Sequence, residues 1–291
     1  MARRALCVGI NEFESLPQSS WLGGCVNDAN DVAKALRPLG FTGRSTTVLT
    51  DAAATKSAVM AALTKLVDTA KAGDHIVFTI SSHGTQVPNE PGGDFEPDDL
   101  DEAFACHDIR QKGDQWDRDT VIVDDELRDL FARVPSGVLL EVLLDTCHSG
   151  TGLKDLEEIM QAQLLGRKPR FLPPPTREGL EKTRELRALA PTGRPDRRAL
   201  VELTKSRSTA SKPVLFAACK SGQTASDATF DNRSNGAFTY LFLKALAGQP
   251  GAPRADLLRT VTAGLKDGHF SQRSTLEGPV KSKKVGFGQP W

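Results

Sequence analysis

Short apolar runs alternate along this chain with longer segments whose apolar residues recur at helical spacing. The runs predict buried strands at 5–10, 45–49, 75–80, 138–144 and 213–219, and the periodic segments predict helices at 27–39, 55–72, 125–134, 236–246 and 255–266. Strands separated by helices of this length imply right-handed crossovers and a mostly parallel sheet. The predicted fold class is therefore α/β, an open sheet with helices on both faces in a three-layer sandwich.

Two stretches break the alternation. Residues 89–108 are rich in Asp and Glu and predict an acidic loop. Residues from about 153 to 211 hold three consecutive prolines and many Lys and Arg residues, and they predict an exposed linker with a helical piece near 178–189. So long an irregular insertion is uncommon in a compact domain, so it is either disordered or functional. We divide the chain into 1–158, a basic linker at 159–210, and 211–291.

Composition narrows the class of protein. Hydrophobic residues make up 39% of the 291 residues, and 37 basic residues balance 37 acidic ones, so no overall field favours nucleic acid or an anionic membrane as a partner. No apolar run is long enough for a membrane span or a signal-peptide core, so we expect a cytoplasmic protein. Five cysteines without C-x-x-C spacing argue against a disulfide framework and a structural zinc site.

Two predicted strands end in residues that suit a thiol nucleophile and its base. One continues into Ser81-Ser82-His83-Gly84, and the other into Asp145-Thr146-Cys147-His148-Ser149-Gly150. Open α/β sheets place their chemistry at these carboxyl ends. Cys147 would attack a carbonyl as thiolate, and His83 would take its proton or protonate the leaving amine. The backbone N–H groups of Gly84 and Cys147 would then stabilise the oxyanion.

The alternative is that Cys147 is a buried structural thiol and His83 a core histidine. Their positions at two strand ends in matching motifs favour the catalytic interpretation. His148 is the other candidate base, but neighbouring side chains on an extended segment point to opposite faces, so His148 should face away from the sulfur.

These motifs resemble those of the caspase-like peptidases, in particular the metacaspases and bacterial caspase homologues. Further similar segments are Leu22–Ala29, Val123–Leu127, Ala218–Asp227 and Gly236–Tyr240. The resemblance covers about 3–158 and 211–288. It implies a caspase-like fold with large- and small-subunit regions in one chain and a cysteine endopeptidase activity; regulated cell death or defence is what the family suggests.

The sequence departs from the caspase-like pattern at two places. The nucleophile is not preceded by the Gln-Ala of animal caspases, and residues 272–278 lack the Gln-x-Pro element expected there. A catalytically idle caspase-like scaffold and a different thiol hydrolase are the competing functions. The pairing of Cys147 with His83 argues against the scaffold.

The acids near the nucleophile indicate the substrate. Asp145 lies two residues before Cys147 on the same strand face, where burial without a cationic partner is costly. The resemblance maps a second pocket carboxylate to Asp28, and we also assign Ser81 to substrate binding. Two carboxylates suit a substrate Arg or Lys at P1, the residue before the scissile bond. For Asp28 the alternative is a carboxylate that interacts with a helix N-terminus.

The chemistry itself needs no cofactor, but the resemblance implies Ca²⁺ as an activator. In calcium-dependent metacaspases the residues corresponding to Asp124 and Asp125 bind the ion, with a further aspartate that aligns to Asp108. Hard oxygen ligands in a flexible loop suit Ca²⁺. The alternative is that Asp124 simply caps the following helix, with Asp125 and Glu126 in its first turn.

The basic linker predicts a processing segment. We expect a precursor that is cut by the enzyme itself or by an upstream activating protease, because proteolytic nicking concentrates in exposed flexible loops. Arg187, Arg198 and Arg207 precede small residues and are the favoured cleavage positions. A solvated spacer or a docking surface for an acidic partner is the alternative.

Overall fold

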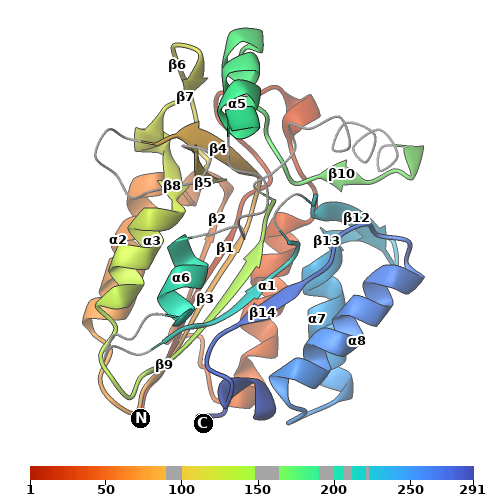
Figure 1. Cartoon of the computed structure of the whole chain (residues 1–291). Helices are drawn as coiled ribbons and strands as arrows, with labels where there is room; N and C mark the ends of the chain where they lie inside the picture. Colours follow the sequence, from red (N-terminus) through yellow and green to blue (C-terminus); the bar gives the residue numbers. More distant parts are fainter. Residues whose placement is uncertain (90–99, 148–163, 190–198, 206–211, 221–222) are drawn as a thin grey trace.

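A six-stranded sheet forms the centre of the molecule (Figure 1). The computed structural model describes residues 1–89, 100–147, 164–189, 199–205, 212–220 and 223–291. The strand order is β14-β11-β9-β3-β1-β2, formed by β1 (Arg3–Gly9), β2 (Thr46–Thr50), β3 (His75–Ser81), β9 (Leu139–Asp145), β11 (Val214–Ala217) and β14 (Thr275–Glu277). Neighbouring strands pair in parallel except β14, which runs antiparallel to β11. The predicted α/β class with a mostly parallel sheet is confirmed.

Helices cover both faces of this sheet. On one face lie α2 (Lys56–Asp68) and α3 (Asp124–Ala132), and on the other lie α1 (Cys25–Ala35), α7 (Ala237–Gly248) and α8 (Arg254–Asp267). The alternation along each strand sends successive side chains to opposite layers. In β1, Leu6 and Val8 belong to the apolar cluster beneath α2 and α3, whereas Ala5 and Cys7 belong to the cluster beneath α1, α7 and α8. This confirms the three-layer sandwich.

Short antiparallel strands that the apolar pattern did not predict surround the carboxyl edge of the sheet. They are β4 (Gly84–Pro88), β5 (Leu100–Ala105) and β8 (Val121–Val123) in one sheet, β10 (Lys168–Pro169), β12 (Ser226–Phe230) and β13 (Arg233–Gly236) in another, and the β6 (Gln111–Lys112) and β7 (Gln115–Trp116) pair. The acidic loop predicted at 89–108 is therefore wrong in part, because 100–105 form a buried strand paired on both sides.

The linker predicted at 159–210 is not simply an exposed spacer. Arg170, Phe171 and Leu172 are buried, and β10 pairs with β12. The helical piece is confirmed as α5 (Arg177–Leu189), and α6 (Ala199–Lys205) contacts α3 and places Leu203 in the core. These elements escaped detection because each apolar group is short and lies among prolines and charges.

All five cysteines are buried, and none is paired with another in the structure. Within the described ranges, no helix combines the length and the apolar character that crossing a membrane requires.

Candidate active site

The parallel register of β3 and β9 brings the predicted nucleophile and base to one edge of the sheet. Ser81 pairs with Asp145 at the last rung of the two strands. His83 and Cys147 each lie two residues after this last pair. Both residues therefore stand at the same level of the sheet's carboxyl edge. Beyond His83 the chain turns into β4, which starts at Gly84.

The surroundings of His83 select one tautomer. Its side chain is buried, packs against the ring of Phe13, and its Nε2 lies 2.7 Å from the carbonyl oxygen of Ser20. A carbonyl can only accept, so Nε2 carries the proton and Nδ1 of the neutral ring keeps its lone pair. Nδ1 has no hydrogen-bond partner among the described residues. Burial lowers the pKa of His83 to about 4, although the bond to Ser20 opposes this effect, so the ring is a neutral base at neutral pH.

Cys147 is also buried at this edge. Its thiol donates to the carbonyl oxygen of Gln223, with Sγ and oxygen 2.7 Å apart. Gln223 in turn holds the segment after α8, because its Oε1 accepts from the backbone N–H of Arg273 and its Nε2 donates to the carbonyl of Ser271. The nucleophile is thereby tied to the loop at 271–273.

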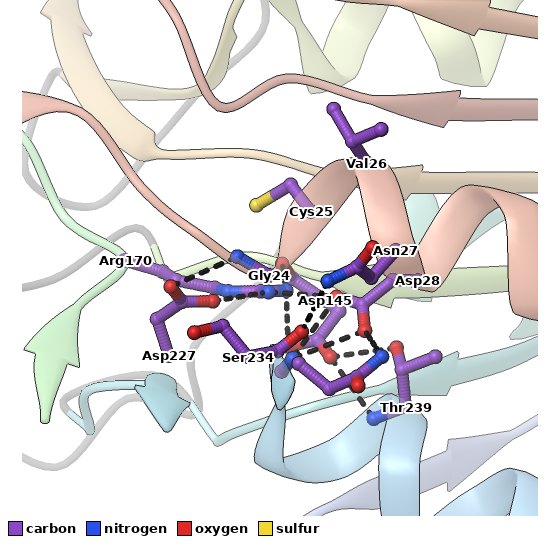
Figure 2. Close-up of polar contacts among 12 residues, drawn as sticks. Gly24, Cys25, Val26, Asn27, Asp28, Asp145, Arg170, Asp227, Ser234 and Thr239 are labelled. Atoms are coloured by element: carbon purple, nitrogen blue, oxygen red, sulfur yellow. Dashed lines mark hydrogen bonds and ion pairs between the residues drawn. The ribbon is translucent and has the colours of Figure 1, made fainter. Parts of the chain in front are cut away.

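Next to this edge, the guanidinium of Arg170, a linker residue, is enclosed by carboxylates (Figure 2). The Arg170 side chain is 0% exposed. Its nitrogens lie 2.6 Å from a carboxylate oxygen of Asp28, 2.8 Å from one of Asp227 and 3.2 Å from one of Asp145. Nη1 also donates to the carbonyl of Asp145 at 3.0 Å. Burial alone would lower the pKa of Arg170, but these carboxylates hold it well above its usual value, so the residue is a cation.

Each carboxylate is held by donors from a different element. Asp28, in the first turn of α1, accepts from the side chain of Asn235 at 2.9 Å and from the backbone of Gly236 at 3.0 Å. Asp145 accepts from the backbone and hydroxyl of Thr239 at the start of α7, at 3.0 and 2.7 Å. Asp227 accepts from the backbone N–H groups of Gly23 and Gly24 at 2.8 and 3.1 Å. The donors fix the carboxylates around the guanidinium, and we call these three residues the acidic pocket.

The acidic pocket is tightly packed around Gly236, and its buried charges change the pKa of one of its carboxyl groups. A side chain at Gly236 would collide with the carboxylate of Asp145 and the guanidinium of Arg170, so glycine is required there. Burial raises the pKa of Asp28 to about 7, in spite of the opposing charge of Arg170, and the charge of Asp145 adds to the increase. Three buried acids around one cation make this a cation-binding pocket.

The backbone around Arg170 runs through the site in extended form. Its N–H donates to the carbonyl of Ala225 at 2.9 Å, and its carbonyl oxygen accepts from the N–H of Gly84 at 2.9 Å. The N–H of Leu172 donates to the carbonyl of Gly84 at 2.9 Å. Just before Arg170, β10 pairs antiparallel with β12. The predicted oxyanion donor Gly84 thus hydrogen-bonds a carbonyl oxygen whose residue has its side chain in the acidic pocket.

The structure unites most of the predicted substrate residues and adds two. Asp28 and Asp145 both contact the guanidinium of Arg170, and Asp28 also lies at a helix N-terminus, so its role in substrate binding stays a prediction. Ser81 is buried opposite Asp145, but it does not contribute to the hydrogen bonds and ion pairs of Arg170 within the described chain. Asp227 and Arg170 were missed. Two signals could have found them: Asp227 ends one of the segments that resemble the caspase-like family, and Arg170 directly precedes the apolar pair Phe171-Leu172.

The proposed calcium ligands do not form a site by themselves. Among the described residues no group of three or more His, Cys, Asp or Glu could hold a metal ion. Asp108 instead accepts from the backbone N–H of Lys56 at 2.9 Å, and Asp125 pairs with Arg128 at 2.7 Å. Asp124 is buried at the first position of α3, one residue after the capping position that the capping alternative gave it. Residues 90–99 of the acidic stretch lie outside the described ranges, so calcium activation stays a prediction.

The predicted processing positions are only partly described. Arg187 lies in α5, and its guanidinium donates to the side-chain oxygen of Gln86 at 2.6 Å. Arg198 and Arg207 lie outside the described residues, as does the candidate base His148. A helical position is a poor protease substrate, because a protease must first extend the chain.

Comparisons with known proteins show which family the chain resembles. Residues 3–156 match the family model described as metacaspase, peptidase C14 domain. The chain is 31% identical over 301 residues to Metacaspase-1 of Cryptococcus neoformans, covering 94% of this chain but 62% of that protein. It is 30% identical to Metacaspase-1A of Aspergillus fumigatus, covering 94% of this chain and 68% of the relative. The chain therefore spans about three fifths to two thirds of the length of these curated relatives.

A solved structure of a protein from Geobacter sulfurreducens matches with a TM-score of 0.66 at 22% identity, covering 98% of this chain and 97% of that one. At this identity the likeness supports the fold alone.

Proposed function

The chain belongs to the metacaspase family of C14 peptidases, and on that premise we propose that it is a cysteine endopeptidase that hydrolyses peptide bonds after Arg or Lys. One observation carries the specificity. The Arg170 guanidinium is enclosed by Asp28, Asp145 and Asp227 at the sheet edge that holds Cys147 and His83. The pocket therefore accepts a basic side chain already, with a peptide backbone attached to it.

The proposed reaction follows the position of Arg170. A substrate P1 residue bound like Arg170 would have its carbonyl oxygen against the N–H of Gly84. Sγ of Cys147 forms a bond to the carbonyl carbon, the thiol proton passes to Nδ1 of His83, and the oxyanion is stabilised by the N–H groups of Gly84 and Cys147. The C–N bond then breaks as His83 protonates the leaving amine. Water, deprotonated by His83, hydrolyses the thioester and restores the thiol.

The acidic pocket also determines which residues the enzyme should prefer at P1. Arginine can serve several carboxylates at once through its planar fork of donors, whereas a lysine ammonium is a single point charge, so Arg should be preferred to Lys. An Asp at P1 would add a fourth carboxylate to a buried cluster of three and should be rejected.

We further propose that the chain is a precursor and that the Arg170–Phe171 bond is the first to be cut. The support is the extended course of the segment, with the side chain of Arg170 in the acidic pocket and its carbonyl on Gly84. A substrate cannot bind while this segment lies there. Arg187, Arg198 and Arg207 remain predictions for later cuts.

Two measurements test the function. Mass spectrometry of the purified wild type and of Cys147→Ala should find fragments 1–170 and 171–291 in the wild type alone. The processed enzyme should then cleave a peptide library with Arg at P1 best, Lys second and Asp not at all. Equal cleavage after Asp and Arg would refute the pocket assignment, and no cleavage of any peptide would favour the idle scaffold.

A further inference from the structure

The residues that precede Arg170 contact a second surface, at the end of α8. Arg167, three residues before Arg170, places its guanidinium carbon 3.8 Å from the centre of the Phe270 ring. Its two terminal nitrogens donate to the carbonyl oxygens of Gly268 and His269, at 2.6 and 2.8 Å. The side chain is therefore engaged by one aromatic face and two carbonyls at once.

The way α8 ends explains why these carbonyls are available. The N–H of His269 bonds back to the carbonyl of Lys266, and that of Phe270 to the carbonyl of Leu265, which is the hydrogen-bond pattern of a Schellman motif. His269 accordingly adopts a left-handed φ of 55°. The carbonyls of Gly268 and His269 accept no helical bond, and they stand at the negative end of the helix dipole. A cation beside them is favoured electrostatically.

The position of the Phe270 ring is also fixed. A side chain at Gly268 would come within 2.8 Å of the ring, so glycine at this position lets Phe270 lie over the helix end. Phe270 also packs near Phe230, with ring centres 6.1 Å apart, and Phe230 stacks on Tyr240. The ring therefore needs no rearrangement to receive a cation.

We propose that Gly268, His269 and Phe270 form a subsite for an arginine at P4, the substrate residue three positions before P1. The inference rests on the proposed function, because it treats residues 167–170 as bound in the manner of P4 to P1. Arginine suits the site better than lysine, since a planar guanidinium can stack on the ring while donating to two carbonyls. The subsite directly precedes the loop at 271–273 that Gln223 ties to Cys147, so binding there would position a substrate relative to the nucleophile.

An experiment can tell whether these contacts bind substrates or only anchor the uncut linker. If the subsite serves substrates, the processed enzyme should cleave Arg-Lys-Pro-Arg followed by a reporter amine about tenfold more efficiently than Ala-Lys-Pro-Arg, judged by kcat/KM, for one cation–π contact and two hydrogen bonds. Glu at P4 should be cut less efficiently than Ala. If the contacts only anchor the uncut linker, the three peptides should be cleaved equally, and the inference is overturned.

A pair of variants tests whether the ring of Phe270 binds the P4 arginine. Phe270→Leu should lower kcat/KM for the P4 arginine peptide several-fold and leave the P4 alanine peptide unchanged. Phe230→Leu, which alters the neighbouring ring, is the matched control and should keep the preference. Should Phe270→Leu fail to fold, the peptide comparison on the wild type still decides the matter. Loss of cleavage after every P1 arginine would refute the proposed function instead, and equal cleavage of all P4 residues would refute this subsite alone.

Discussion

Replacing Arg170 by alanine should destabilise the protein strongly and in a pH-dependent way. The substitution is best made in a Cys147→Ala background, so that no self-cleavage complicates the measurement. It removes the guanidinium but leaves Asp28, Asp145 and Asp227 in place, each still held by its own donors.

The magnitude follows from the burial of the group. Arg170 is fully buried, and two of its carboxylate contacts are shorter than 3 Å. Breaking a buried ion pair by removing one partner typically costs about 3–5 kcal/mol, because the other charge stays buried and uncompensated. We expect a loss in this range at pH 8.5, since the three carboxylates then repel one another without a cation between them.

The loss should be smaller at low pH. The pKa of Asp28 in the folded protein is already about 7, raised above its usual value by burial, and removal of Arg170 raises this pKa further. A carboxyl group whose folded pKa is raised contributes stability below its unfolded pKa, and that contribution is lost as the pH rises through the folded value. The Arg170→Ala variant therefore loses more stability than its parent as the pH rises above about 7. The difference in their free energies of unfolding should be least near pH 5.5.

Urea unfolding followed by tryptophan fluorescence measures both effects. Methylguanidinium ions should restore stability to the Arg170→Ala protein alone, because they bind the folded state through the vacated pocket. Arg177→Ala is the matched control, since Arg177 comes from the same linker segment and forms its ion pair with Glu181 on the exposed surface of α5. A loss below about 1 kcal/mol that is flat from pH 5.5 to 8.5 would refute the electrostatic account of the pocket.

Three further predictions concern activity. Cys147→Ala should abolish proteolysis and His83→Ala should lower it by orders of magnitude, because the pair acts as a unit; an inactive His148→Ala beside a fully active His83→Ala would contradict our choice of base. Asp145→Asn should lower kcat/KM for arginine peptides about 10- to 100-fold through a weakened charge-assisted contact, while circular dichroism reports an intact fold. Millimolar Ca²⁺ should raise both activity and thermal stability by binding the folded form, and Asp124→Asn should reduce the response; equal activity in chelator and no heat of binding would leave Asp124 and Asp125 as helix-end residues.

The sequence predicted the large elements of the fold because their apolar residues are numerous and periodic. In β3 and β9 all seven residues are buried, and the runs from 75 and 138 were recognised within a residue or two. In contrast, β10 has two residues, neither of them buried, and gains its order from pairing with β12. Such strands carry no periodicity of their own, so only tertiary contacts define them.

The candidate site divides in a similar way. Cys147, His83 and Asp145 were predictable because neighbouring parallel strands end at one edge, and residues at their ends must then meet. The partner of Asp145 was taken to be a substrate, whereas the uncut chain supplies Arg170 itself. That contact links residues 142 positions apart in the case of Asp28, and nothing in the local pattern at 167–172 indicates which distant acids will receive the guanidinium.

In the proposed function, the acidic pocket would link substrate selection to the stability of the precursor. With all three acids ionised, three carboxylates and one guanidinium carry a formal excess of two negative charges. An empty pocket would hold three buried acids without a counter-ion, which disfavours the folded chain. Arg170 removes that difficulty in the uncut protein. Once the segment leaves, the pocket must take up protons or bind a basic side chain, and with the pKa of Asp28 near 7 the first becomes less favourable as the pH rises. In the proposed function, binding of a P1 arginine should therefore release protons, and the same buried carboxylates would both destabilise the cut enzyme and favour a basic substrate.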